Sequence, residues 1–181
     1  DLPWRDAAHG SRDPYRVLVS ELMLQQTQVS RVVERFPVFL DRFPTAFALA
    51  VADEDEVLAA WAGMGYYRRA RLLHAAAKAI VEKHGGRLPE EVESLRALPG
   101  VGRYTAGAIA SIAYNLPAPI VDGNVVRVLL RIEGRDGAAD DRNTLAWCWD
   151  RAASLTLRAH GLDDAGPGAF NEGMMELGAT V

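Results

Sequence analysis

The sequence has little cysteine, no long apolar run and no excess of positive charge. Its one cysteine, Cys148, excludes a disulfide framework and makes a reducing compartment the expectation. No apolar run is long enough to cross a bilayer, and no basic, apolar leader opens the chain, so we expect neither a membrane span nor secretion. The four histidines lack metal-ligand spacing, so the sequence predicts no metal site of their making.

The net charge of −4 argues against a strongly basic nucleic-acid-binding domain. The charges are nevertheless unevenly distributed. Acids cluster at 53–56, 90–91 and 163–164, whereas arginines cluster at 68–71, beside the tyrosine pair at 66–67. We expect a small positive face on an acidic body, and binding that weakens with salt.

Apolar residues recur at helical spacing and no stretch alternates with period two, which predicts an all-α fold. At 181 residues the chain can bury about 70% of its unfolded surface, enough for one core or two small lobes. A loop is expected at 134–139. The expected helices run from Asp13 and Pro14 to Pro44, from Asp53 to about Gly63, from Tyr66 to His84, from Pro89 to Leu98, from Tyr104 to Tyr114, from Asn124 to Ile132, from Asp141 to His160 and from Gly168 to Gly178.

A glycine hairpin opens directly into an apolar helix within LPGVGRYTAGAI at 98–109. Such a hairpin turns backbone N–H groups outward at a helix N-terminus, an arrangement that suits a phosphate. The triplet Gly100, Val101 and Gly102 is by itself also typical of a plain turn. Pro99 before it and the small residues after it favour the hairpin.

A single acid, Asp122, begins the next expected helix within VDGNVVR at 121–127, twenty positions after Gly102. An aspartate there can serve simply as a helix N-cap. A phosphate clamp with a carboxylate beside it is also the minimal equipment for chemistry on a nucleotide.

These motifs together resemble the helix-hairpin-helix DNA glycosylases that carry a Gly/Pro-rich loop and a catalytic aspartate. Three more segments are similar to the adenine-specific branch, the MutY-type adenine DNA glycosylases: SELMLQQTQV at 20–29, GMGYYR at 63–68 and GAFNE at 168–172. The similarity extends from Leu2 to Ala179. Several motifs in the expected order are far more specific than any one of them.

The resemblance implies a two-lobed fold with catalysis in the cleft between the lobes. Residues 25–132 would form a six-helix barrel that carries the hairpin, and residues 1–24 with 133–181 would form the second lobe. The implied partner is double-stranded DNA with an adenine mispaired with 8-oxoguanine or guanine, bound by a monomer. The implied location is the bacterial cytoplasm at the nucleoid, or the nucleus.

Cleavage of an adenine N-glycosidic bond needs protonation of the base and stabilisation of a cationic sugar. By resemblance, Glu21 protonates adenine at N7, and its apolar helix neighbours favour a desolvated acid over a solvated surface glutamate. Asp122 stabilises the sugar cation, electrostatically or covalently, and Asn124 helps arrange the site. Tyr104 stands where the bifunctional endonuclease III type carries a lysine, so a monofunctional enzyme is expected, because a phenol forms no Schiff base.

Gln26 and Tyr66 resemble residues that enter the base stack when the adenine is flipped out. A solvated position for Gln26 and core packing for Tyr66 are the alternatives. Arg68 and the three hairpin residues are expected to contact DNA. By resemblance the adenine pocket contains Leu2, Trp4, Arg5 and Glu172.

Two assignments in that pocket have alternatives. The stretch between Arg5 and Arg12 is longer than the family leads us to expect, which leaves the register of Arg5 open. Glu172 also fits a surface helix acid.

Members of this family usually hold a [4Fe–4S] cluster on four cysteines that follow the segment equivalent to ELGA at 176–179. None of the four lies within the residues up to Val181, and we expect Cys148 to be buried packing. Three other functions remain open: a pyrimidine-lesion or mismatch glycosylase of the same superfamily, a non-catalytic DNA-binding module, and a helical protein with a coincidental hairpin.

Overall fold

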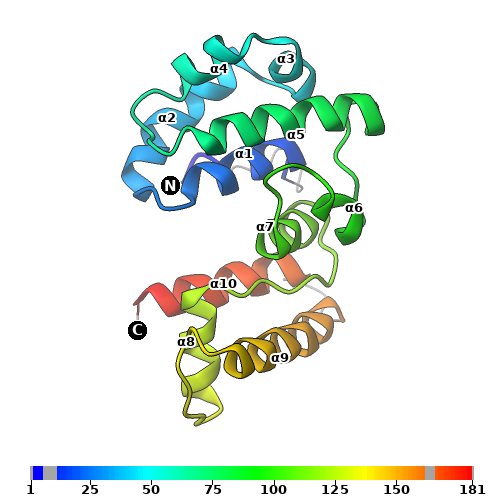
Figure 1. Ribbon diagram of the computed structural model, residues 1–181. Helices are drawn as coiled ribbons and strands as arrows, with labels where there is room; N and C mark the ends of the chain where they lie inside the picture. Colours follow the sequence, from blue (N-terminus) through cyan, green and yellow to red (C-terminus); the bar gives the residue numbers. More distant parts are fainter. Residues whose placement is uncertain (1, 6–11, 162–165, 181) are drawn as a thin grey trace. The chain divides into compact units, whose positions relative to one another are not determined.

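The computed structural model describes residues 2–5, 12–161 and 166–180, and all regular elements within them are helices (Figure 1). The all-α prediction is therefore confirmed. The helices are α1 (Pro14–Leu24), α2 (Val29–Arg42), α3 (Ala46–Val51), α4 (Glu54–Ala60), α5 (Arg68–His84), α6 (Val92–Arg96), α7 (Arg103–Ala108), the π-helical turn η2 (Ile109–Ala113), α8 (Gly123–Ile132), α9 (Arg142–His160) and α10 (Gly166–Thr180).

The chain divides into two units, Asp1–Thr105 and Ala106–Val181. The lobe boundaries implied by the resemblance, near residues 25 and 132, stay a prediction.

Helix α5 is the centre of the first unit and packs against α1, α3 and α4. Its buried apolar side chains are alanines, Leu73 and Ile80, and they recur every three or four residues, which lets neighbouring helices approach closely. The helix ends at Gly85, whose φ of 59° is the left-handed conformation typical of a glycine C-cap. In the same unit, Phe39 makes edge-to-face contacts with Phe43 and Trp61, and these rings fill the core between α2 and α4.

The prediction of one uninterrupted helix from Asp13 to Pro44 is wrong, because the chain breaks between α1 and α2. Gln26 lies in this break with a φ of 54°, which a continuous helix cannot contain. Helix α3 was not predicted, because six residues are too few to show a helical period. Its start is nevertheless marked by Thr45, whose Oγ1 accepts a hydrogen bond from the Ala48 N–H at 3.1 Å.

In the second unit, α10 packs against η2, α8 and α9. The expected helix from Tyr104 to Tyr114 is present as α7, but it widens into the π-helical turn η2 over its last residues. The core between the helices contains Val125, Val126, Leu129 and Cys148. Cys148 is fully buried and burial raises the pKa of its thiol, so its predicted role in packing is confirmed.

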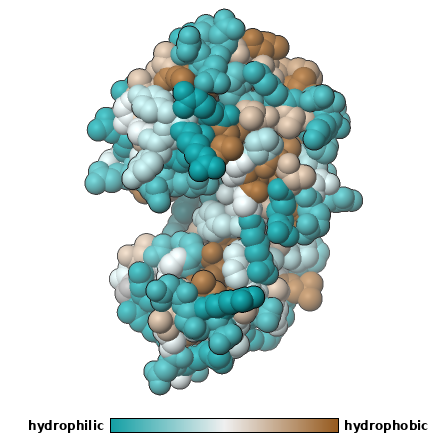
Figure 2. Space-filling view, in the orientation of Figure 1, coloured by the Kyte–Doolittle hydropathy of each residue, from teal (hydrophilic) through white to brown (hydrophobic). Residues whose placement is uncertain are grey.

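Hydrophilic residues cover most of the face shown in Figure 2, and hydrophobic residues appear on it in separate patches. Among the described residues, no helix has both the length and the apolar character required to cross a bilayer.

The glycine hairpin connects α6 to α7, and its two glycines have different surroundings. Gly100 has a φ of 76°, and a Cβ atom there would lie 2.8 Å from the Cβ of Leu72. A Cβ at Gly102 would meet nothing within 4 Å. Gly100 is therefore required by the fold, whereas Gly102 leaves open space beside the backbone.

Replacing these glycines separates the two requirements. We expect Gly100→Ala to lower the free energy of unfolding by about 1–3 kcal/mol, through backbone strain and the clash with Leu72. Gly102→Ala should change it by less than about 0.5 kcal/mol. Urea unfolding followed by circular dichroism measures both values, and equal losses in the two variants would contradict this account of the hairpin.

His74 is a buried titratable side chain on α5 that joins this helix to α3. It is 3% exposed, it lies near the backbone of Ala50 and Ala52, and its Nε2 is buried without a hydrogen-bond partner. Burial lowers the pKa of His74 and the nearby Lys78 ammonium lowers it further. The folded chain therefore holds this imidazole neutral at a pH at which the unfolded chain begins to protonate it.

Acidification should consequently destabilise the fold through His74. Because the unfolded state takes up the proton more readily, the free energy of unfolding falls as the pH drops below about 6.5, by at most about 1.4 kcal/mol per pH unit for one proton. Urea unfolding between pH 7.5 and 5.5 should give a shallower slope for His74→Gln than for the parent. His160→Gln, which changes an exposed histidine, should keep the parent slope, and an unchanged slope in His74→Gln would refute the coupling.

Candidate functional site

Glu21 lies in the last half of α1 and is 9% exposed. Its helix neighbours Val17, Leu18 and Leu22 are buried. This environment is the one expected for a desolvated acid and differs from that of a solvated surface glutamate. A carboxyl group in a buried position is a candidate proton donor.

Asp122 is the N-cap of α8, as the sequence allowed. Its Oδ1 accepts a hydrogen bond from the Val125 N–H at 2.8 Å, and its Oδ2 accepts one from the Asn124 side-chain amide at 3.1 Å. Both oxygens are therefore held by donors, and the N-terminal end of α8 favours their negative charge. Asn124, which the resemblance assigns to this site, therefore contacts the Asp122 carboxylate directly.

Sequence reasoning missed the link from this pair to α10. The Asn124 Oδ1 accepts a hydrogen bond from Arg127 Nη1 at 3.2 Å, and the same nitrogen donates to the Gly178 carbonyl. A Cβ atom at Gly178 would lie 2.4 Å from the Asn124 carbonyl oxygen, so the two backbones can approach only because residue 178 is glycine.

A second missed residue is Asn171, which is 2% exposed on α10. Its Nδ2 donates to Ser111 Oγ and to the Ala118 carbonyl, both at 2.9 Å, and its Oδ1 accepts from Thr156 Oγ1 at 3.3 Å. The amide thereby fixes α10 to η2 and α9. Glu172, the next residue and a predicted pocket residue, is half-buried.

The hairpin residues lie where the sequence predicted them. Val101 is buried and its N–H donates to the Leu98 carbonyl at 3.1 Å, which closes the turn. Gly102 is exposed, immediately before Arg103 begins α7. Tyr104 is half-buried in the first turn of that helix. A Cβ at Gly102 would meet nothing within 4 Å, so the backbone there is open to the approach of a phosphate.

Gln26 and Tyr66 are brought together in the first unit. Together with Gln25, Arg68, Arg69 and Leu72 they line a hollow of about 490 Å³. Both side chains are exposed, and both backbones have positive φ values, 54° for Gln26 and 47° for Tyr66. The alternative of core packing for Tyr66, which is 63% exposed, is wrong.

The N-terminal pocket residues form a short turn in which the Arg5 N–H donates to the Leu2 carbonyl at 2.8 Å. Trp4 is 8% exposed and its ring meets Phe36 edge-on at 5.8 Å, so it also contributes to the core. Leu2 and Arg5 are half-buried. The unexpectedly long stretch after Arg5 lies largely outside the described residues.

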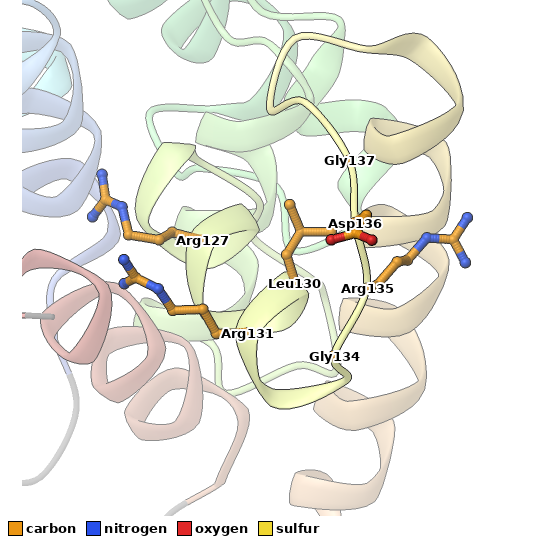
Figure 3. A pocket seen from close by; sticks show the side chains of 7 residues that line it. All are labelled: Arg127, Leu130, Arg131, Gly134, Arg135, Asp136 and Gly137. Atoms are coloured by element: carbon orange, nitrogen blue, oxygen red, sulfur yellow. The ribbon is translucent and has the colours of Figure 1, made fainter.

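A second hollow, of about 450 Å³, lies at the C-terminal end of α8 and carries three arginines. Figure 3 shows Arg127 and Arg131 pointing to one side and Arg135 to the other, so the three guanidinium groups do not converge. Arg135 lies over the Trp147 ring, 4.7 Å from its centroid. None of the predicted site residues lines this hollow.

The residues present do not fit a [4Fe–4S] cluster. Such a cluster needs four thiolates, whereas residues 1–181 contain only Cys148, which is buried in the core of the second unit. Among the described residues, no three histidine, cysteine, aspartate or glutamate side chains are placed to hold a metal ion.

The chain is similar in sequence to known adenine DNA glycosylases. Mouse adenine DNA glycosylase is 47% identical over an alignment that covers all of this chain and 35% of that protein. The human adenine DNA glycosylase is 48% identical, with 33% of its length covered, and that of Mycobacterium tuberculosis is 43% identical, with 57% covered. The chain thus spans between a third and somewhat over half of these relatives.

Solved structures share the fold. A thermostable thymine-DNA glycosylase superposes with a TM-score of 0.85 at 28% identity, covering all of this chain and 79% of the other. A non-covalent endonuclease III–DNA complex superposes with a TM-score of 0.65 at 23% identity, covering 93% of this chain and 86% of the other. The family described as HhH-GPD superfamily base excision DNA repair protein matches residues 19–153, most of the sequence. The chain belongs to the HhH-GPD superfamily of base excision DNA repair proteins.

Proposed function

We propose that this chain is the catalytic region of an adenine DNA glycosylase, which removes adenine mispaired with 8-oxoguanine or guanine by hydrolysing its N-glycosidic bond. The observation that carries the proposal is the buried Glu21, within a chain that is similar over its whole length to adenine DNA glycosylases. Double-stranded DNA is the proposed partner. The hairpin around Gly102 grips its backbone without choosing a sequence.

The proposed reaction begins with proton transfer. Glu21 donates its proton to N7 of the flipped adenine, so the bond to the sugar can break with its electron pair passing to the base. The cation that develops on the sugar is stabilised by the Asp122 carboxylate, which two hydrogen bonds already hold in place. Water then adds to the sugar and returns a proton to the Glu21 carboxylate.

The product of this reaction is an intact abasic site. Tyr104 stands where a Schiff-base lysine is needed for strand cleavage, and a phenol cannot form that adduct. We therefore propose a monofunctional enzyme.

A specific observation favours a second candidate, removal of a pyrimidine, because a thymine-DNA glycosylase shares this fold with a TM-score of 0.85. A pyrimidine has no N7 for Glu21 to protonate. Two duplexes separate the candidates, one with thymine opposite guanine and one with adenine opposite 8-oxoguanine. The proposal expects release of adenine from the latter and no release of thymine from the former.

Glu21→Gln tests the role of the general acid. The amide keeps the size of the side chain but carries no transferable proton, so we expect the rate of base release under single turnover to fall by at least about 10²-fold. The dissociation constant for the same duplex, measured by anisotropy, should stay within about threefold of the parent value, less than the loss of one hydrogen bond. Glu34→Gln, an exposed glutamate on α2, is the matched control and should release adenine at the parent rate. Release by Glu21→Gln at the parent rate would refute the assignment.

Asp122→Asn separates catalysis from capping. Asparagine is as good an N-cap as aspartate, so the free energy of unfolding should change by less than about 1 kcal/mol. Removing the charge should still lower the rate of base release by at least about 10²-fold, because the sugar cation loses its counter-charge. A variant that keeps both its stability and its rate would show that Asp122 is an N-cap alone.

A further inference from the structure

The guanidinium of Arg69, at the start of α5, is 7% exposed and lies against the end of α1. Its Nη1 donates to the carbonyls of Leu22 and Met23, at 3.0 and 2.9 Å, and to the carbonyl of Gln25. The last carbonyls of a helix have no partner within the helix. Arg69 supplies those partners and so closes the C-terminal end of α1.

The other nitrogen of the same group holds two loops together. Arg69 Nη2 donates to Thr27 Oγ1 at 2.9 Å, in the loop between α1 and α2. It also donates to the carbonyls of Met64 and Gly65, at 3.2 and 3.4 Å, in the loop between α4 and α5. One side chain therefore ties the segments 25–28 and 63–67 to each other.

Each of these loops carries an exposed residue in a strained conformation. Gln26 lies between two residues that bond to Arg69, and Tyr66 follows a third, with its ring centroid 5.4 Å from the guanidinium carbon. Both have positive φ values, 54° and 47°. Non-glycine residues keep this conformation only where their surroundings impose it.

We propose that Arg69 is a positioning residue, which fixes Gln26 and Tyr66 as one preformed wedge that enters the base stack as adenine is extruded. The inference rests on the proposed function. The energetic basis is preorganisation. Because the wedge is already ordered before DNA binds, no conformational entropy is lost in ordering it while the base leaves the stack. Lysine cannot replace the arginine, because its donors radiate from a single nitrogen and cannot serve the two loops together.

The experiment follows base extrusion directly. A duplex carries 2-aminopurine in the adenine position opposite 8-oxoguanine, and its fluorescence rises when the base unstacks. Under stopped flow, Arg69→Lys should slow this rise by at least about tenfold, as expected for a misplaced group. Anisotropy should show its affinity for an undamaged duplex within about twofold of the parent value, because the hairpin is unchanged.

Arg42→Lys is the matched control. Arg42 is exposed and pairs with Glu56 at 2.8 Å, and this variant should extrude the base at the parent rate. Extrusion by Arg69→Lys at the parent rate, in a folded protein, would overturn the inference.

A double-mutant cycle distinguishes positioning from general stabilisation. Gln26→Gly with Tyr66→Gly removes the wedge, and glycine accepts both positive φ values, so this double variant should stay folded and extrude slowly. Adding Arg69→Lys to it should lower the extrusion rate no further, because the two changes act through the same wedge. Full additivity of the two effects would show that Arg69 is merely structural.

Two further measurements keep the inference testable if Arg69→Lys does not fold, or if the parent releases no adenine. Thr27→Val removes one acceptor of Arg69, and an extrusion rate equal to the parent rate would contradict the inference. In the free chain, hydrogen exchange should be faster in Arg69→Lys, or in Thr27→Val, at 25–28 and 63–67 than in the parent. If the parent releases no adenine but the variants show this faster exchange, the proposed function is refuted and the wedge is not. If the parent releases adenine but exchange in the variants equals that of the parent, the wedge is refuted and the proposed function is not.

Discussion

The hydrogen bonds of Arg69 are the interaction on which the first unit depends. They terminate α1 one turn after Glu21 and hold the two loops that carry Gln26 and Tyr66. A charged donor in a buried position is costly unless it is fully used. Here Nη1 and Nη2 donate to six backbone and side-chain acceptors, which offsets part of that cost, whereas Nε is buried without a hydrogen-bond partner. The position of the proposed acid and the shape of the proposed wedge thus have one physical origin.

In the second unit, the Asp122 carboxylate is held in place through the close approach of two backbone segments. Gly178 allows α10 to touch the backbone at Asn124, and Arg127 joins the same two positions by hydrogen bonds. Asn171 fixes the other part of α10 to η2 and α9. Asp122 is therefore held by its own helix terminus and, through Asn124, by a helix that begins more than forty residues later. A preorganised charge of this kind needs no rearrangement when the sugar cation forms.

Sequence patterns predicted the long helices well, because α5 and α9 show several turns of apolar periodicity; α5 ends at a glycine cap and α9 begins at the Asp141 cap. They missed the break at Gln26, since that break depends on an arginine more than forty residues away. The cap at Asp122 and the hairpin at Gly100 were predictable because both are local motifs. The contacts of Asn171 and Gly178 were not, because they join segments distant in the chain and carry no local signal. The burial of Glu21 agrees with its apolar helix neighbours, whereas its role in the reaction was inferred from the resemblance alone.

The central claim is that this chain hydrolyses the adenine glycosidic bond and leaves the strand intact. A single-turnover assay on a duplex with adenine opposite 8-oxoguanine, with each sample divided and one half heated in alkali, tests it most directly. The account predicts strand breaks at the adenine position after alkali and none without it. Breaks without alkali would contradict the argument from Tyr104, and the absence of breaks in both halves would contradict the assignment of catalysis to Glu21 and Asp122.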